Sequence, residues 1–379
     1  MKKALMTAHV AYAIEMFNIP NIQLLQSMGY EVQVACNFDD RSSLSDEKVQ
    51  ALKEKLTAMG VTYHNIPFQR NPLKPQNLKA FLLLKKLIDR EGFSMIHCHT
   101  PVGGILTRLA AVRSRMRGTK VIYTAHGFHF FKGAPLINWL IYFTAEWLCS
   151  FFTDILITIN KEDFHNAEAG LHAKKVKYVP GVGVDTAHFA GTQGNRASLL
   201  KEISAGEDSI ILLGVGELSD RKNHSVSIKA LSEIKDERVH LVIAGRGEKE
   251  EEFRALSKEL SIEDRVHLLG FRTDIAELMK SADIFVFPSL QEGLPVALME
   301  AMACSLPSVC SEIRGNTDLI EDSEGILCKV NDITAFREAV EKLINDETLR
   351  GSMAEKALAK SKEYDKKIIE SYMRDIYSI

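Results

Sequence analysis

The chain has 379 residues, which is long enough for two or three domains. Its 46% apolar and 26% charged residues are typical of a soluble globular protein, and its formal net charge of −3 argues against a nucleic-acid partner. The charge is uneven, because residues 1–185 hold 22 Lys+Arg and 15 Asp+Glu, a net +7, whereas the remainder holds 25 and 35, a net −10. This asymmetry predicts two units that face different partners.

The sequence also bears on the compartment in which the protein works. Its first residues, MKKALMTAHV, lack a sustained apolar run and predict a β-strand rather than a signal peptide. The most apolar region, residues 134–160, is interrupted by Glu146 and Asp154, so we do not expect it to span a membrane. The six cysteines are scattered and form no Cys-x-x-Cys pair, which favours a reducing cytoplasm and argues against disulfides and zinc.

Short apolar, β-branched runs alternate with helical stretches along the whole chain. In the first half these runs are KALMTA, EVQVAC, TYHNIP, MIHCHT, KVIYTAH, DILITIN and VKYVP. In the second half they are IILLGVG, VHLVIAG, VHLLGF, DIFVFPS, PSVCSE and GILCKV. Because many are continuously apolar, they predict parallel strands buried on both faces. Two such series favour two doubly wound, Rossmann-like α/β domains over one (β/α)₈ barrel.

A Gly-rich stretch over residues 179–200 has no strong periodicity and lies in mid-chain, as an interdomain linker does. We therefore predict a first domain over residues 1–185 and a second over residues 186–362. Residues 363–379 are amphipathic, and we expect them to form a helix that returns to the first domain.

In open parallel sheets, ligands bind beyond the carboxyl ends of the strands, so the loops there are the candidate sites. GELSDRKN begins at Gly216 and carries Arg221 and Lys222 near an expected helix start, where backbone amides and cations favour a phosphate. A surface turn with solvated charges explains this loop equally well. GRGEKEE, which contains Arg246, lacks the third glycine of the dinucleotide fingerprint, so it does not favour NAD.

The segment EGLPVALMEAM places two carboxylates around the start of one helix. Glu292 lies on the loop, and Glu300 lies about 7–8 Å further along the helix axis. This separation argues against a close acid/base pair and suits two hydroxyl-bearing ends of a large polar ligand. The alternative is a glutamate that complements the helix dipole plus an exposed helix glutamate.

Histidines and basic helices mark the first half. His126 follows a strand in YTAHGFHF and can hydrogen-bond a ligand hydroxyl or carbonyl, whereas His129 shares its loop or lies on the surface. His97 and His99 share a strand face but are an incomplete set of metal ligands. The basic stretches RLAAVRSRMRGTK and KAFLLLKKLIDR suit anionic lipid headgroups or a lipid diphosphate, and a solvated helix face explains them as well.

The E-x7-E pair lies within FVFPSLQEGLPVALMEAMACSLPSV, which resembles the donor-site block of the retaining glycosyltransferases of family four. The segments VGELSDRKNH, VIAGRGEKEEEF and VHLLGFRTDI have the order and spacing of that family. FNIPNIQLLQSMGYEVQVAC, IHCHTPVGGILTRLAA, YTAHGFHFFKGAPLINW and LITINKEDF…VPGVGVD resemble bacterial capsule and exopolysaccharide glycosyltransferases. The resemblance covers nearly the whole chain and implies the GT-B fold, in which two Rossmann-like domains face each other across a cleft.

The resemblance also implies roles for matching residues. Lys222, with Arg221, would hold the donor diphosphate; Glu292 would bind the donor sugar and Glu300 the ribose; His126 would lie against the transferred sugar. The implied catalytic residues are His126 and Glu292. The implied donor-binding residues are Gly216, Arg221, Lys222, Arg246, Phe271, Arg272, Gly293, Leu294, Pro295 and Glu300. The implied acceptor-side residues are His9, Tyr12, Phe128 and His129.

The family typically transfers its sugar without a metal and without a cofactor, and the chain has no Asp-x-Asp pair to hold one. Two positions depart from the family pattern. Many members have an arginine where this chain has Glu217, and many have a Gly-rich loop after the first strand, where this chain has the glycine-free TAHVAYAIEMF. His9 or Tyr12 would substitute for that loop.

We therefore predict a cytoplasmic retaining glycosyltransferase that works at the inner face of the cell membrane. It would transfer a sugar from a UDP-sugar to a lipid-diphosphate-linked saccharide in capsule or exopolysaccharide synthesis, in peripheral contact with anionic lipid. One alternative is a UDP-sugar 2-epimerase of the same fold. A second is a non-catalytic, two-lobed sugar-binding protein, which the lack of a signal peptide disfavours.

Overall fold

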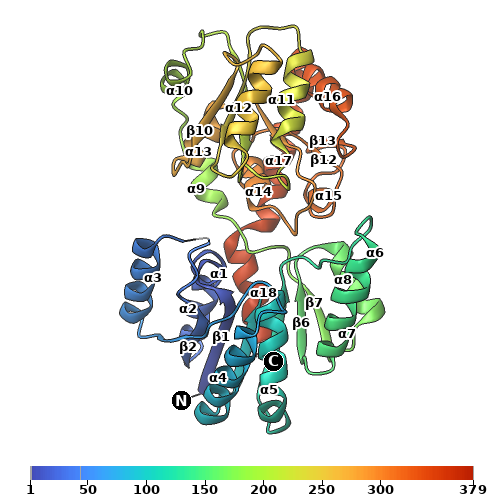
Figure 1. The fold of residues 1–379 in the computed structure, drawn as a ribbon. Helices are drawn as coiled ribbons and strands as arrows, with labels where there is room; N and C mark the ends of the chain where they lie inside the picture. Colours follow the sequence, from blue (N-terminus) through green and yellow to red (C-terminus); the bar gives the residue numbers. More distant parts are fainter. Residues whose placement is uncertain (1, 43, 379) are drawn as a thin grey trace. The chain divides into compact units, whose positions relative to one another are not determined.

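The computed structural model describes residues 2–42 and 44–378. The chain forms two compact units, Met1–Pro180 with Ile369–Ile379 (unit 1) and Gly181–Ile368 (unit 2) (Figure 1). Each unit is built on one sheet in which every strand pair is parallel. The predicted pair of doubly wound α/β units is thereby confirmed.

Unit 1 contains a seven-stranded sheet. Its strands are β1 (Lys2–Val10), β2 (Tyr30–Asn37), β3 (Thr62–Asn65), β4 (Met95–His99), β5 (Lys120–Ala125), β6 (Ile155–Thr158) and β7 (Lys175–Tyr178). Its helices are α1 (Ala11–Phe17), α2 (Ile19–Ser27), α3 (Asp46–Ala58), α4 (Gln76–Glu91), α5 (Pro101–Met116), α6 (Leu136–Asn138), the π-helix η1 (Trp139–Phe143), α7 (Thr144–Ser150) and α8 (Lys161–Gly170).

Unit 2 contains a six-stranded sheet. Its strands are β8 (Ile210–Val215), β9 (Val239–Ala244), β10 (Val266–Gly270), β11 (Ile284–Phe287), β12 (Ser308–Ser311) and β13 (Gly325–Cys328). Its helices are α9 (Thr186–Gly191), α10 (Arg196–Glu202), α11 (His224–Glu233), α12 (Glu250–Glu259), α13 (Ile275–Ser281), α14 (Val296–Ala303), α15 (Asn316–Leu319), α16 (Ile333–Asn345), α17 (Glu347–Ser361) and the 3₁₀-helix η2 (Lys362–Tyr364). The last helix, α18 (Lys366–Ser378), begins in unit 2 and continues into unit 1.

The strand orders fix where ligands can bind. The orders are β3-β2-β1-β4-β5-β6-β7 in unit 1 and β10-β9-β8-β11-β12-β13 in unit 2. In each sheet the order in which the strands are added therefore reverses once, between β1 and β4 in unit 1 and between β8 and β11 in unit 2. In doubly wound sheets the ligand crevice lies beyond the carboxyl ends of the strands at this reversal. The loops that follow β1, β4, β8 and β11 are consequently the best placed to hold one.

The start of the chain differs from the sequence-based prediction. TAHVAYAIEMF was expected to be a loop, but β1 runs to Val10 and α1 begins at Ala11. Small and apolar side chains make this direct junction possible, since Val10, Ala11 and Ala13 are all buried. His9 is therefore the second-last residue of strand β1, and Tyr12 lies in the first turn of helix α1, so neither residue lies on a loop.

The second part of α18 completes the core of unit 1. Ile369, Met373, Ile376 and Tyr377 are buried in the same cluster as the strand residues of β1 and β2. Figure 1 accordingly shows the second part of α18 among the elements of unit 1. Across residues 2–42 and 44–378, the structure contains no helix that is both long enough and apolar enough to cross a membrane.

Candidate active site

An ion-pair cluster, largely buried at Lys222 and Glu292 and exposed at Arg221, lies at the reversal point of the unit 2 sheet. Lys222 comes from the loop after β8, and its Nζ lies 2.8 Å from Oε1 of Glu292, on the loop after β11. Arg221 Nη1 donates to the same carboxylate oxygen at 3.0 Å. The side chains of Lys222 and Glu292 are only 12% and 9% exposed. The structure thus brings together three residues that the sequence analysis assigned to one ligand.

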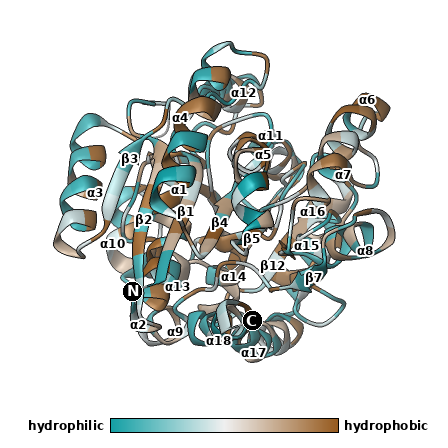
Figure 2. Cartoon of the chain, turned by 90° about the horizontal axis from the view of Figure 1, so that it is seen from below, coloured by the Kyte–Doolittle hydropathy of each residue, from teal (hydrophilic) through white to brown (hydrophobic). Residues whose placement is uncertain are grey.

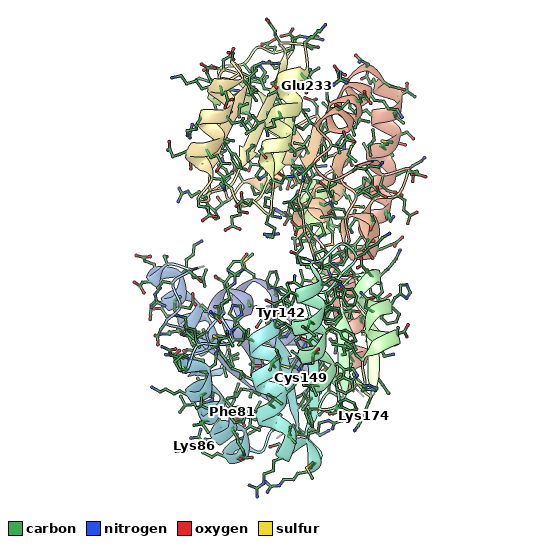
Figure 3. All side chains as sticks on the ribbon, turned by 45° about the vertical axis from the view of Figure 1, so that its right-hand side comes forward. Phe81, Lys86, Tyr142, Cys149, Lys174 and Glu233 are labelled. Carbon is green, nitrogen blue, oxygen red and sulfur yellow. The ribbon has the colours of Figure 1, made fainter. Side chains whose placement is uncertain are left out.

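The environment of Lys222 is unusual for a lysine. Burial lowers the pKa of its ammonium, and attraction to Glu292 opposes part of that shift. The Nζ also lies 4.6 Å from the ring centroid of Phe287, the last residue of β11. A cation held in an apolar wall at the start of α11 is well suited to a diphosphate, since the helix amides add to its field. Helix α11 runs from this site to Glu233 at its far end (Figure 3).

Two loops lie against each other beside this cluster, and glycines make the contact possible. A Cβ built on Gly245 would lie 1.8 Å from the carbonyl oxygen of Gly216, and one on Gly247 would lie 2.2 Å from that of Leu218. The glycines of GRGE are therefore explained by close backbone approach rather than by a dinucleotide. Leu218 donates its N–H to the carbonyl of Arg246 at 3.0 Å, which joins the two loops. The side chain of Arg246 is exposed.

The loop of Glu292 is held from behind by a residue that the sequence analysis missed. Arg314 is 8% exposed, and its Nε and Nη2 both donate to the backbone carbonyl of Glu292 at 3.2 Å. The neighbouring Gly315 has a φ of +84°, and a Cβ there would lie 2.4 Å from the carbonyl oxygen of Gly293. Both residues follow β12, so their place after a strand of the same sheet was the available signal. Leu294 is buried, and Pro295 caps α14.

Glu300 lies on α14, apart from the cation cluster. Burial raises the pKa of its carboxyl to about 7. In the part of the chain that the structure describes, its side chain makes no hydrogen bond or ion pair. A half-buried carboxyl without a partner is a natural acceptor for ligand hydroxyls. Glu292 lies on the loop before α14 and Glu300 lies within the helix, the placement that the sequence predicted.

The two residues predicted near the nucleotide base follow β10 and differ in exposure. Phe271 is 56% exposed and so presents a flat apolar ring at the strand end. The side chain of Arg272 is instead paired with two carboxylates. Its Nη1 donates to Glu202 at 2.7 Å, and its Nε donates to Asp274 at 2.8 Å. The guanidinium therefore fixes this loop against α10, and Phe271 is the better placed of the two to contact a ring.

In unit 1, three histidines gather at the strand ends. His126 Nε2 lies 3.0 Å from Nδ1 of His99, and the ring centroids of His97 and His99 are 4.1 Å apart. His97 bonds through its ring nitrogens to Tyr377 Oη and Thr124 Oγ1, each at 2.8 Å. Burial lowers the pKa of His126 to about 4, so its imidazole is neutral at pH 7 and acts as a hydrogen-bonding group.

The remaining acceptor-side residues lie around His126. The ring of Phe17 contacts both His126, at 5.3 Å, and Tyr12, at 6.0 Å between centroids. Burial lowers the pKa of His9, whose backbone N–H donates to Thr100 Oγ1 at 3.2 Å. His9 and Tyr12 thus lie at the reversal point of the unit 1 sheet.

The HGFHF loop is anchored by its aromatic residues. Phe128 is 3% exposed and stacks on Phe130, with ring centroids 4.5 Å apart, so it packs in the core, and it also lines a small pocket. Its N–H donates to Asp163 Oδ2 at 2.9 Å, a buried contact that the sequence analysis missed although Asp163 follows β6. His129 stacks on Tyr142 at 4.6 Å. A small pocket beside this loop is lined by His129, Tyr142 and Glu146.

Among the described residues, no group of three or more His, Cys, Asp or Glu side chains could hold a metal ion. His97 and His99 were considered above as an incomplete pair of metal ligands. The ring nitrogens of His97 bond to Tyr377 and Thr124, and those of His99 contact His126 and the Met6 sulfur.

Comparison with known proteins assigns the chain to a family. Residues 195–360 match the family described as "Glycosyl transferases group 1", and residues 6–160 match "Glycosyl transferase 4-like". EpsD of Bacillus subtilis (strain 168), described only as a glycosyltransferase, is 37% identical over 100% of this chain and 96% of its own length. A UDP-Gal:alpha-D-GlcNAc-diphosphoundecaprenol alpha-1,3-galactosyltransferase of Escherichia coli is 31% identical over 74% of each chain.

Solved structures agree on the fold. The crystal structure of Anabaena HepE in complex with UDP and glucose superposes with a TM-score of 0.80 over 100% of both chains, at 19% sequence identity. At this identity the likeness establishes the architecture alone. The chain belongs to the group 1, family-four glycosyltransferases, whose fold is GT-B.

Proposed function

We propose that this glycosyltransferase moves a sugar from a UDP-sugar to a lipid-diphosphate-linked saccharide in the synthesis of a capsule or exopolysaccharide. The observation that carries the proposal is the cluster of Lys222, Arg221 and Glu292 at the reversal point of the unit 2 sheet. Two cations and a carboxylate there match the two ends of a sugar diphosphate. The E. coli relative, whose name specifies UDP-galactose and a diphosphoundecaprenol acceptor, supports the choice of substrates.

In this proposal the protein's own groups neutralise the leaving diphosphate, and no metal or cofactor takes part. Lys222 and Arg221 turn from Glu292 to the phosphates, and the first amides of α11 add to their field. Glu292 then accepts hydroxyls of the donor sugar, and Glu300 accepts those of the ribose. HepE, which was solved with UDP and glucose, supports a nucleotide-sugar pocket in this fold.

The proposed chemistry retains the anomeric configuration. The bond between the anomeric carbon and the diphosphate oxygen breaks, and the acceptor hydroxyl forms its bond to that carbon on the same face. The departing diphosphate takes the proton of the acceptor hydroxyl. His126 is neutral because burial lowers its pKa to about 4, so it contributes a hydrogen bond to the transferred sugar rather than a proton.

We further propose that the enzyme acts in the cytoplasm, at the inner face of the membrane, because a lipid-linked acceptor lies there. Residues 70–132 carry 12 Lys+Arg and 2 Asp+Glu, which suits contact with anionic lipid headgroups.

The test is release of UDP from a panel of UDP-sugars with and without a lipid-diphosphate-linked saccharide. We expect release that depends on the acceptor, and its loss in Lys222→Ala and Glu292→Ala but not in Lys229→Ala, a control on the exposed side of α11. Unchanged activity in both site variants would refute the site. Conversion of the UDP-sugar to its 2-epimer without an acceptor would refute transfer in favour of an epimerase.

A further inference from the structure

The segment α6–η1–α7 is apolar on its outward face as well as on the side that packs on the core. Eight residues at helical spacing face outward and are exposed; we call them the outward stripe: Leu136, Ile137, Leu140, Ile141, Thr144, Trp147, Leu148 and Phe151. Leu136 is 86% exposed and Leu140 is 68% exposed. The stripe contains no charged residue. A helix at the surface of a globular protein normally turns its charges outward and its apolar residues inward.

The single charge between residues 133 and 153 lies on the inner side instead. Glu146 is 5% exposed, and its Oε2 lies 2.8 Å from Nη1 of the buried Arg108 on α5. Tyr123 Oη donates to Glu146 Oε1 at 3.1 Å, and the Arg108 guanidinium lies over the Tyr123 ring at 3.9 Å. This buried network fixes the rotation of α7, so the residues of the outward stripe stay exposed while Trp139, Tyr142 and Phe143 pack on the core. Figure 3 labels Cys149, another residue of the buried side.

The helices that pack beside the stripe also expose apolar and basic residues. Of the 21 exposed large hydrophobic residues among those described, 13 lie between Leu73 and Phe151. Helix α4 packs on α5, and α5 packs on α7. Helix α5 exposes Leu109 and Met116 next to Arg113 and Arg117. Figure 2 colours α6 and much of α7 in the brown of hydrophobic residues.

We infer that the outward stripe is an interfacial docking surface that inserts into the headgroup and upper acyl region of an anionic membrane. The stripe offers a partner only the Thr144 hydroxyl and the Trp147 indole N–H for hydrogen bonding. A protein interface typically has about one hydrogen bond per 100–200 Å², whereas hydrocarbon requires none. Basic residues beside an apolar helical face provide the complementary charge for anionic lipid.

The ends of the stripe fit this orientation. Trp147 and Phe151 pack on the exposed His172, with ring centroids 5.7 and 4.4 Å apart, so amphipathic rings lie where headgroups would be. Lys174, 68% exposed, pairs with Asp154 at 2.7 Å just beyond this end, and Lys132 is exposed before the other. This inference rests on the proposed function in one respect. The proposed acceptor is lipid-linked, so the enzyme must meet it at a membrane.

Vesicle binding tests the surface directly. The full chain is sedimented with vesicles of phosphatidylcholine and with vesicles of phosphatidylcholine and phosphatidylglycerol. We expect binding to the anionic vesicles, and a fall of about tenfold or more in Leu136→Gln/Leu140→Gln/Leu148→Gln. Val330→Gln/Ile368→Gln, exposed apolar positions in unit 2, should bind like the wild type. Arg113→Gln/Arg117→Gln should weaken binding by about tenfold at low salt and by less at high salt.

Tryptophan fluorescence gives an independent measure of depth. The chain's two tryptophans, Trp139 and Trp147, both belong to this segment. Brominated acyl chains should quench the emission of Trp147, which lies in the stripe, in the wild type and much less in the triple glutamine variant, whereas Trp139 packs on Phe130 and should be quenched less. Unfolding curves check that the variant keeps its fold, which is expected because its three changes are at exposed positions.

Three outcomes would overturn the inference: wild type that binds neither kind of vesicle, a triple variant that binds as wild type does, or a wild-type dimer in lipid-free solution that the triple variant converts to monomer. The last would assign the stripe to a second copy of the chain. Failure of the proposed function is separate, since transfer to a detergent-dispersed acceptor is assayed without vesicles. The triple variant should retain that transfer.

Discussion

Lys222 Nζ and Glu292 Oε1 lie 2.8 Å apart although the two residues are separated by 70 positions in the chain. The cation and the carboxylate thus satisfy each other in the ligand-free protein, with Arg221 as a second donor. A diphosphate that binds to Lys222 competes with Glu292, and its arrival releases the carboxylate for hydroxyl groups. The diphosphate should therefore bind to Lys222 before Glu292 becomes available to the sugar.

Replacing Glu292 should separate binding from transfer. In Glu292→Gln the competing carboxylate is gone, so we expect UDP alone to bind about three- to tenfold more tightly, while transfer falls by about a hundredfold or more. Calorimetric titration with UDP and a transfer assay measure the two effects. Glu217→Gln is the matched control, because that carboxylate is exposed and lies 3.9 Å from Arg221. Weaker UDP binding in Glu292→Gln would contradict the exchange.

Replacing Lys222 should lower the affinity for UDP, whereas replacing Glu292 should raise it. Lys222→Met keeps the length of the stem but removes the charge that faces the phosphates. We expect UDP affinity to fall by about thirtyfold or more, as for loss of a buried charged partner, and transfer to fall with it. If UDP bound equally well, the diphosphate would have to lie elsewhere.

Glu300 should make stability depend on pH. Its pKa in the folded protein is about 7, raised by burial from 4.5. The folded state therefore holds a proton that the unfolded state has released, so stability falls as pH rises from about 5 to above 7, by at most about 3 kcal/mol. Glu300→Gln should remove this fall. Thermal unfolding of both proteins between these pH values measures it, and parallel curves would contradict the assignment.

The loops after β8 and β9 touch at glycines, so adding a single methyl group there should lower both stability and UDP affinity. Gly245→Ala would place its Cβ 1.8 Å from the Gly216 carbonyl oxygen. We expect a loss of roughly 1–3 kcal/mol in unfolding free energy together with weaker UDP binding. Gly351→Ala on α17 meets nothing within 4 Å, and it should be neutral or stabilise the helix by up to about 1 kcal/mol. Equal effects from both changes would argue against the close approach.

Removing only one charge of the buried Arg108–Glu146 pair behind α7 should lower the free energy of unfolding strongly. Arg108 and Glu146 are 1% and 6% exposed in their side chains, so Arg108→Met leaves a buried carboxylate without its cation. We expect a loss of about 3–5 kcal/mol, and a smaller loss in Arg108→Met/Glu146→Leu, which removes both charges. Denaturant unfolding measures both. Breaking the exposed pair Arg374–Glu370 should change stability little.

Much of the fold could be predicted because the strands are buried on both faces. The run IILLGVG is continuously apolar and VHLVIAG is interrupted only by His240, and both lie in parallel strands, β8 and β9. Their alternation with helices then places Lys222 and Glu292 at strand ends. The contact between them was not predictable, because it depends on β8 lying beside β11 rather than on any local pattern.

Other features of the site depend on backbone geometry that side-chain patterns do not encode. Arg314 holds the Glu292 loop through a carbonyl oxygen, which every residue possesses. The helical α1 replaces an expected loop, because a strand can pass directly into a helix when the junction residues are small or apolar. Glu146 was counted as an interruption of an apolar region, whereas it is turned inward by Arg108.

The placement of α18 has a consequence for biosynthesis. Its buried residues, Ile369 to Tyr377, belong to the core that β1 and β2 begin, yet the ribosome adds them only after all of unit 2. Unit 1, which emerges first, therefore cannot complete its core until α18 has emerged. Tyr377 then supplies the hydroxyl that pairs with His97, so the hydrogen bonding of the histidine cluster is complete only once α18 has docked.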